Sequence, residues 1–376
     1  MIRPTRASLL LRTLCCLVAI APLASTTTAA PRLDELRVPP GFVVELVTDE
    51  LPNARQLALA DDGTLYAGTR EDGRVWALRD GTRYTLARGL TMPSGIALRG
   101  DDLYVAAVDR VLRLRSIGAD LAQPPEPEVI TDALPEDGHH GWKHIEFGPG
   151  GDLWVPVGAP CNICAPADPY AALLRMDPDS GDYVVAARGI RNTVGFDFEP
   201  GTGDLWFTDN GRDWLGDDTP PCELNRLDVG ETTAVHYGYP HVHGAAIRDP
   251  EFGDGGEPTD AYAAPAWEFG AHTAPLGVAF YDHDAFGPEW QGTLFVAQHG
   301  SWNRSAKVGY QVLAVRIEDG RVRSAEPFLT GFLDGERAWG RPVDVLVDHD
   351  GSLLVSDDAQ GAVYRVRRAG GAVSAR

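Results

Sequence analysis

The chain has 376 residues, of which 44% are hydrophobic and 23% are charged. Its 42 glycines and 28 prolines together make up about 19% of the residues, against roughly 12% in average proteins. This composition excludes an intrinsically disordered chain and favours a globular protein rich in turns. The formal net charge is −21 at pH 7. Such a surface repels phosphate backbones, so nucleic acid is not an expected partner, whereas a basic redox protein or a divalent cation would be attracted.

Residues 1–30 have the layout of a secretory signal. The segment begins with a basic part that contains Arg3, Arg6 and Arg12. An apolar stretch then covers residues 14–23, and small residues follow up to Ala30. This stretch is too short to span a bilayer, which takes about 20 residues. We therefore expect a Sec-type signal peptide over 1–30, a periplasmic or secreted protein without a stable membrane span, and a single domain over 31–376. An uncleaved membrane anchor is the alternative.

Three cysteines follow the expected signal. Cys161 and Cys164 form a C-x-x-C pair, and Cys222 stands alone. A disulfide is the expected state in an exported protein, whereas a zinc site would need further ligands that the sequence does not show. Because the pair is local, we predict a Cys161–Cys164 disulfide and a free Cys222.

One pattern occurs six times along the chain: a short apolar strand, a Gly/Asp turn, and a second, strongly apolar strand. The copies begin at Gln56, Ser94, His144, Val194, Leu276 and Val343. Several copies are followed by a further alternating strand, as at residues 74–78, 110–114 and 362–366. Three or four strands per repeat, six times, predict an all-β fold, a six-bladed β-propeller. A β-sandwich is the rival, but it would not repeat the same hairpin six times.

Residues 42–47 form an additional predicted strand ahead of the first repeat. We expect it to occupy the outermost place in the last blade, beside residues 362–366, and so to close the ring. The interval between the fourth and fifth repeats is unusually long and contains two polar, aromatic segments, residues 209–218 and 236–244. Long loops on a rigid propeller are where ligands usually bind.

Four blades have a basic or histidine side chain just before the innermost strand, where it can point towards the central axis. These residues are His140, Arg191 with Asn192, His272 with Thr273, and Arg341. A histidine here can act as a general base near neutral pH, and an arginine can bind an anion. A surface histidine is the alternative for His140, and a salt bridge to the acidic loop is the alternative for Arg191. A site of this kind suits an anionic cofactor or substrate held with a metal ion.

At these residues the sequence resembles the soluble quinoprotein glucose and sorbosone dehydrogenases, six-bladed propellers that use pyrroloquinoline quinone (PQQ). The resemblance extends from about residue 39 to residue 367. It is carried by Gly141-Trp-Lys-His-Ile-Glu-Phe-Gly-Pro, Arg188-Gly-Ile-Arg-Asn-Thr-Val-Gly-Phe-Asp-Phe, Trp206-Phe-Thr-Asp-Asn-Gly-Arg-Asp, Glu223-Leu-Asn and Ala297-Gln-His-Gly-Ser-Trp-Asn-Arg-Ser.

The resemblance implies roles for single residues. His140 corresponds to the catalytic base, and Arg191 with Asn192 corresponds to the pair beside quinone and substrate. Gly211 and Arg212 correspond to residues whose backbone carbonyls bind the cofactor calcium. A cofactor contact is further implied for Arg341, with Arg304 or Lys307 in place of a fifth-blade lysine. For His272 and Thr273 we expect such contacts from their position before the fifth blade, although His272 replaces a small polar residue of the family. In contrast to the family, no glutamine precedes the second blade near Ser94, and Val343 replaces a second arginine.

The implied activity is oxidation of an aldose or sorbosone-type sugar at its anomeric or aldehyde carbon, with hydride transfer to PQQ and calcium as the cofactor's metal. His140 would take the hydroxyl proton, and Arg191 would stabilise the developing charge. Two alternatives from other classes remain open. A metal-dependent lactonase can have the same fold, and a non-catalytic ligand-binding propeller would need no enzymatic site.

Overall fold

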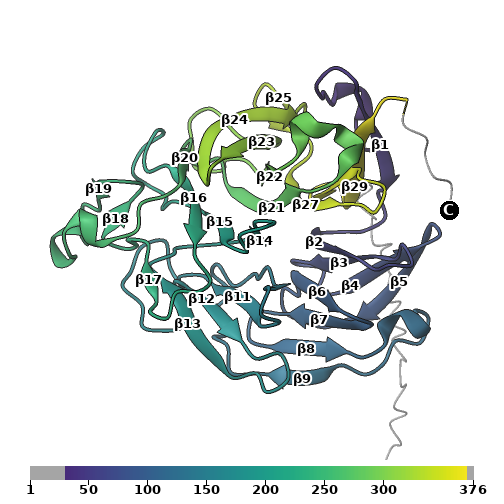
Figure 1. Ribbon diagram of the computed structural model, residues 1–376, viewed down its shortest axis with the longest axis horizontal. Helices are drawn as coiled ribbons and strands as arrows, with labels where there is room; N and C mark the ends of the chain where they lie inside the picture. Colours follow the sequence, from purple (N-terminus) through teal and green to yellow (C-terminus); the bar gives the residue numbers. More distant parts are fainter. Residues whose placement is uncertain (1–29, 371–376) are drawn as a thin grey trace, which may run out of the picture.

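A computed structural model describes residues 30–370 of the chain. Six sheets follow one another around a ring, which confirms the six-bladed β-propeller (Figure 1). The expected signal peptide lies almost wholly outside the described residues. Within residues 30–370 no helix has the length and apolar character needed to cross a membrane.

Each blade is an antiparallel sheet, apart from one parallel strand added to blade 3. The innermost strand comes first in the chain in every blade except blade 6, where the outermost strand precedes it. Blade 1 contains β2 (Ala54–Leu59), β3 (Leu65–Thr69), β4 (Val75–Arg79) and β5 (Thr82–Ala87). Blade 2 contains β6 (Gly95–Arg99), β7 (Asp102–Ala106), β8 (Val111–Leu114) and β9 (Glu128–Thr131). Blade 3 contains β10 (Glu146–Phe147), β11 (Leu153–Val157), β12 (Ala172–Met176) and β13 (Tyr183–Arg188), with β17 (Val235–His236) parallel to β13.

The second half of the ring follows the same order. Blade 4 contains β14 (Phe196–Phe198), β15 (Leu205–Asp209), β16 (Cys222–Leu227) and β20 (Trp267–Phe269). Blade 5 contains β21 (Pro275–Tyr281), β22 (Thr293–Gln298), β23 (Gln311–Glu318) and β24 (Arg321–Leu329). Blade 6 contains β27 (Pro342–Val347), β28 (Leu353–Asp357), β29 (Ala362–Arg368) and β1 (Phe42–Thr48).

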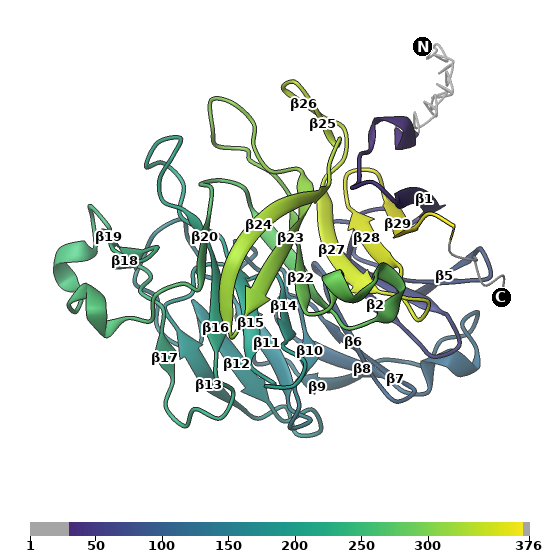
Figure 2. The same ribbon diagram turned by 45° about the horizontal axis from the view of Figure 1, so that its top comes forward.

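Two small hairpins and six short 3-10 helices complete the described chain. The hairpins, β18 (Val242–His243) with β19 (Ile247–Arg248) and β25 (Leu333–Asp334) with β26 (Arg337–Ala338), project from the ring (Figure 2). The 3-10 helices are Leu33–Glu35, Ile117–Ala119, Gly253–Gly255, Thr259–Ala261, Asp284–Phe286 and Pro288–Trp290.

The repeat places its turns where the sequence pattern predicts them. Gly63 and Gly151, in the turns between the first two strands of blades 1 and 3, have φ angles of 83° and 85°. Only glycine adopts this conformation without steric cost. The apolar side chains of the repeat then form a separate cluster between every two neighbouring blades, including blades 6 and 1. The ring is therefore held by six similar interfaces.

Strand β1 joins the N-terminal part of the chain to the last blade. It pairs antiparallel with β29, and the pairing runs from Phe42 opposite Arg368 to Thr48 opposite Val363. Phe42 is buried, and its ring meets those of Phe286, Trp290 and Phe328 edge-on. Blade 6 therefore contains residues from both ends of the described chain.

We predict that Phe42→Ala lowers the free energy of unfolding by about 3–5 kcal/mol, because a buried aromatic side chain is lost from a packed cluster. Leu46→Ala, on the same strand but partly exposed, is the control and is expected to cost much less. Urea denaturation measures both variants. Equal, small losses would show that the packing of β1 contributes little to the stability of the ring.

Candidate functional site

A cavity of about 370 Å³ lies among the loops that precede the innermost strands. His140, Arg191, His272 and Arg341, from four successive blades, all line it. The structure thus brings together four residues that the sequence analysis expected to point towards the central axis. Asn192 and Gly211 also line the cavity.

His140 is held in a strained and fully defined position. Its φ angle is 51°, in the left-handed region that a non-glycine residue adopts at a cost of about 1–3 kcal/mol. Its Nδ1 lies 2.8 Å from the carbonyl oxygen of Ala159. Because a carbonyl only accepts, Nδ1 carries the hydrogen in the neutral ring, and Nε2 is left with its lone pair.

The surroundings of His140 keep the imidazole neutral. Burial lowers its pKa well below the usual range, and the neighbouring charges of Arg191 and His139 lower the pKa further. Trp142 meets the His140 ring edge-on, and the guanidinium of Arg70 lies 4.5 Å above the Trp142 ring centroid. The side chain can therefore accept a proton near neutral pH.

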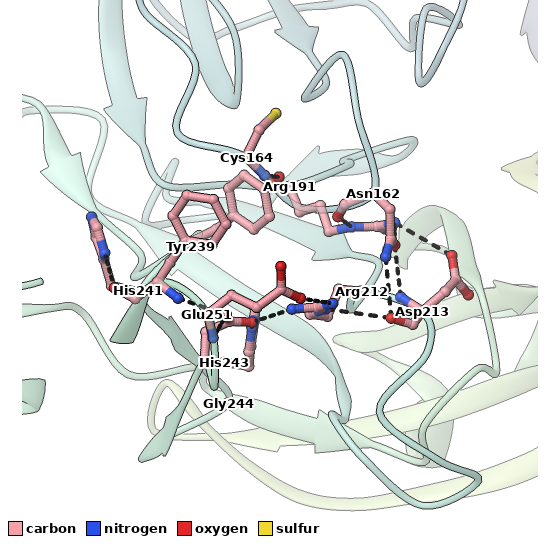
Figure 3. Close-up of polar contacts among 12 residues, drawn as sticks. Asn162, Cys164, Arg191, Arg212, Asp213, Tyr239, His241, His243, Gly244 and Glu251 are labelled. Atoms are coloured by element: carbon pink, nitrogen blue, oxygen red, sulfur yellow. Dashed lines mark hydrogen bonds and ion pairs between the residues drawn. The ribbon is translucent and has the colours of Figure 1, made fainter. Parts of the chain in front are cut away.

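Arg191 is oriented by the loop that contains the cysteine pair. Its Nε and Nη2 donate to the backbone carbonyl and the side-chain oxygen of Asn162, each at 2.8 Å (Figure 3). Its Nη1 donates to the carbonyl of Asn210. A carboxylate oxygen of Asp213 lies 3.5 Å away. The three shortest hydrogen bonds of the guanidinium go to uncharged oxygens, while the carboxylates of Asp213 and Asp209 act on it electrostatically.

The structure confirms the predicted disulfide between Cys161 and Cys164, while Cys222 is free and buried. Asn162 lies between the two bonded cysteines, and the amide of Cys164 donates to the Tyr239 hydroxyl at 3.0 Å (Figure 3). The disulfide loop is thus anchored on one side to Tyr239, and on the other it contacts Arg191.

Buried carboxylates fix the backbone of two arginine segments. Asp209, at the end of β15, accepts the amides of Arg191 and Asn192 at 2.8 and 2.6 Å. Asp357, at the end of β28, accepts the amide of Arg341 at 3.0 Å. Burial raises the pKa of Asp209 to about 6 and that of Asp357 to about 7.

The sequence reasoning missed several residues of the cavity wall, among them Arg55, Arg70, Asp213, His299 and Trp302. Arg55 directly precedes the first repeat. This is the position before an innermost strand at which Arg191 was identified, so Arg55 could have been predicted in the same way. Its Nη1 lies 2.8 Å from Asp358, which also accepts from His299 at 2.8 Å. Burial lowers the pKa of His299 to about 4, so this second imidazole is neutral too.

Four of the predicted cofactor residues do not line the cavity. The Arg212 side chain forms a buried ion pair with Asp249 at 2.7 Å and a partly exposed one with Glu251 at 2.9 Å (Figure 3). The Thr273 hydroxyl donates to the carbonyl of Gly270.

Arg304 and Lys307 are engaged elsewhere. Arg304 pairs with Asp218 at 3.0 Å, and the Lys307 ammonium donates to the carbonyl of Glu336. The expectation that Arg304 or Lys307 replaces a cofactor lysine is therefore not met in this geometry, because nearer acceptors hold both side chains. A role of the Arg212 backbone carbonyl in calcium binding stays a prediction.

Polar atoms of the cavity wall lack partners within the protein. The Nε atoms of Arg55 and Arg70, the indole N–H of Trp142 and the side-chain oxygen of Asn192 are buried and make no hydrogen bond. Buried polar groups are nearly always paired, so the three N–H groups indicate a ligand with acceptor atoms, and the Asn192 oxygen indicates a donor or a cation. Across residues 30–370, no three His, Cys, Asp or Glu side chains gather in a way that could hold a metal ion.

The chain matches the sequence model of the TrAA12-like family over residues 176–369. It is also 31% identical to an uncharacterized protein of Borreliella burgdorferi over 360 residues, which cover 92% of this chain and 94% of that protein. The chain belongs to the TrAA12-like family.

Solved structures share the fold of this TrAA12-like protein. The calcium structure of the Trichoderma reesei family AA12 protein has a TM-score of 0.76 and 19% identity, covering 92% of this chain and 100% of that one. The holo PQQ domain of pyranose dehydrogenase from Coprinopsis cinerea has a TM-score of 0.74 and 19% identity, with coverages of 90% and 98%.

The PQQ-bound aldose sugar dehydrogenase of Streptomyces coelicolor has a TM-score of 0.62 and 18% identity, with coverages of 88% and 99%. The fold that was predicted from the resemblance to soluble PQQ-dependent sugar dehydrogenases is thereby confirmed.

The position of His140 in this TrAA12-like protein depends on a glycine opposite it. A Cβ atom at Gly158 would lie 2.5 Å from the Cβ of His140 and 2.7 Å from its carbonyl oxygen. We predict that Gly158→Ala lowers the free energy of unfolding by about 1–3 kcal/mol through overpacking. Gly150→Ala, whose added Cβ has its nearest neighbour at 3.6 Å, is expected to change stability by less than about 0.5 kcal/mol. Urea denaturation compares the two, and an unaffected Gly158→Ala variant would contradict the prediction.

Proposed function

We propose that this protein is an exported quinoprotein sugar dehydrogenase that oxidises an aldose or sorbosone-type sugar with PQQ and calcium. The observation that carries the proposal is the pairing of a neutral, tautomer-fixed His140 with Arg191 in one cavity. Export is supported by the signal-like pattern of residues 1–30. The strongly acidic composition favours a basic redox protein as the electron acceptor.

The donors of the cavity fit the carboxylates and carbonyls of PQQ. Arg55, Arg70, Arg191 and Arg341 place four guanidiniums on its wall, although the chain as a whole is strongly acidic. Guanidinium groups bind planar carboxylates well, and the unpaired N–H groups of Arg55, Arg70 and Trp142 add donors. We assign the binding of the anionic cofactor to these residues.

Calcium prefers oxygen ligands, many of them from backbone carbonyls and amides. The side-chain oxygen of Asn192 has no partner and lies on the cavity wall with Gly211. We propose that this oxygen and the carbonyls near Gly211 and Arg212 face the cation. A site of this composition does not depend on three or more His, Cys, Asp or Glu side chains around the ion, and no such group is found in residues 30–370.

The chemistry of this chain's own residues follows from their positions. The Nε2 atom of His140 accepts the proton of the sugar hydroxyl on the carbon that is oxidised, because Nδ1 is already committed to Ala159. The Arg191 guanidinium supplies positive charge at the place where negative charge develops in the reaction. Its hydrogen bond to the Asn162 side chain keeps the guanidinium in this position. Bound PQQ would supply the hydride acceptor.

Reconstitution tests this function directly. We expect the mature protein to bind PQQ in the presence of calcium and to reduce a dye with an aldose or sorbosone. Chelation should weaken PQQ binding, measured by calorimetry, and should lower the thermal stability of the loaded protein, because a ligand stabilises only the state that binds it. Unchanged PQQ affinity after chelation would rule out the calcium bridge. Absence of PQQ binding under all conditions would contradict the proposed function.

His140→Ala is predicted to leave PQQ and calcium binding nearly intact and to lower kcat by a factor of about 10² to 10⁴, the usual contribution of a positioned base. His139→Ala is the matched control. Its ring contacts that of His140 but it does not line the cavity, so a much smaller loss is expected. If the two variants exchange behaviour, His139 is the base, and if neither loses turnover, the assigned mechanism is wrong.

The pH profile gives an independent test. The neutral form of His140 is the active one, and its pKa in the folded protein lies below 6.5. Activity should therefore be lost only as the pH falls through this lowered pKa, so the histidine limb of kcat/KM is expected well below pH 6.5. NMR of the imidazole should show no protonation of His140 between pH 7.5 and 6.5. A histidine limb at or above pH 6.5 would contradict the assignment.

A further inference from the structure

Two tryptophans at the rim of the cavity are exposed. Trp214, in the loop between β15 and β16, is 66% exposed, and Trp302, between β22 and β23, is 67% exposed. They are the only aromatic residues among the exposed large hydrophobic residues of the described chain. Their rings meet edge to face, with centroids 5.5 Å apart. Apolar surface left in water at such a place usually marks a binding site.

The two loops that carry these rings are tied together. The Arg304 guanidinium donates to the carbonyl of Asp217 at 3.1 Å and to the Asp218 carboxylate at 3.0 Å. The amide of Ser305 donates to the Asp217 carboxylate at 3.0 Å, and His272 binds the carbonyl of Gly216 at 2.8 Å. These hydrogen bonds hold the loops that carry the two indole rings in place relative to each other. They also engage the Arg304 side chain, which explains why it does not reach the cavity.

Trp214 is also in an unfavourable backbone conformation. Its φ angle is 72°, in a region where a bulky side chain is an outlier. Strain of this kind costs about 1–3 kcal/mol and is concentrated at functional sites. The fold thus maintains both a strained backbone and an exposed indole at this position.

The tryptophan pair continues the cavity outwards. Trp302 lines the cavity, and Trp214 contacts Trp302 but is not part of the wall. A sugar chain that extends from the cavity past Trp302 would next meet Trp214. The C–H face of a pyranose is apolar and packs on an indole ring, while Asp218, with a side chain 87% exposed, can accept hydroxyl protons beside the rings.

We propose that Trp214 and Trp302 form a subsite for a second sugar unit, so that neutral oligosaccharides bind with their reducing end in the cavity. Only the part of this inference that places the reducing end in the cavity rests on the proposed function. The tryptophan pair is continuous with the cavity wall, which favours a sugar chain over a protein partner. In a protein interface, such residues are typically surrounded by a larger contact area. Exposed carboxylates at the rim disfavour anionic sugars.

The binding test uses the full mature protein without PQQ, so it does not depend on dehydrogenase activity. Saturation-transfer NMR measures the affinity for glucose, cellotriose and maltotriose in the parent protein and in Trp214→Ala. At least one trisaccharide is expected to bind about tenfold more tightly than glucose, and Trp214→Ala should remove this gain while leaving glucose binding unchanged. Val184→Ala, an exposed hydrophobic residue on blade 3, is the control and should retain the gain.

Circular dichroism should show both variants folded as the parent. Equal binding of glucose and both trisaccharides, or a gain that persists in Trp214→Ala, overturns the subsite. With PQQ and calcium, the KM for the preferred trisaccharide should rise in Trp214→Ala while kcat is unchanged. If the variant instead loses only the reduction of cytochrome c, a basic redox protein, the rim is a docking surface for the acceptor and the proposal is wrong. If the parent protein does not reduce the dye, only the dehydrogenase assignment is contradicted, because the NMR experiment tests the subsite independently.

Discussion

The arginine segments at the cavity depend on one interaction, the acceptance of backbone N–H groups by a buried carboxylate. Asp209 binds the amides of Arg191 and Asn192, and Asp357 binds that of Arg341, each from the end of the second strand of its blade. Burying a carboxylate is costly, as the raised pKa values of both show. These hydrogen bonds offset the cost and fix the segment from which the guanidinium extends.

A second layer of contacts directs the side chains once the backbone is fixed. The Cys161–Cys164 loop brings Asn162 to Arg191, and Ala159 sets the tautomer of His140. Both contacts come from the stretch that follows β11 in blade 3. The base and the neighbouring cation are therefore positioned by one segment of chain, and the cavity combines a neutral imidazole with unpaired N–H donors in an otherwise acidic molecule.

Much of this architecture was determined by local features of the sequence. Alternation of apolar residues and turns such as those at Gly63 and Gly151 depends on near neighbours only, so the six blades could be predicted from the chain itself. Ring geometry then brings the residues before the innermost strands together. For this reason the convergence of His140, Arg191 and Arg341 followed from the repeat.

Only the tertiary structure decided what the loop side chains bind. Arg304 pairs with Asp218, 86 residues away in the sequence, and Lys307 meets Glu336 from a different loop. No periodicity describes such contacts, because irregular loops choose their partners by distance in the folded state. The same reason explains why the sequence did not show that the Arg55 Nε makes no hydrogen bond or that Trp302 is exposed. The repeat specifies where loops begin, and the folded ring specifies which acceptor each side chain reaches.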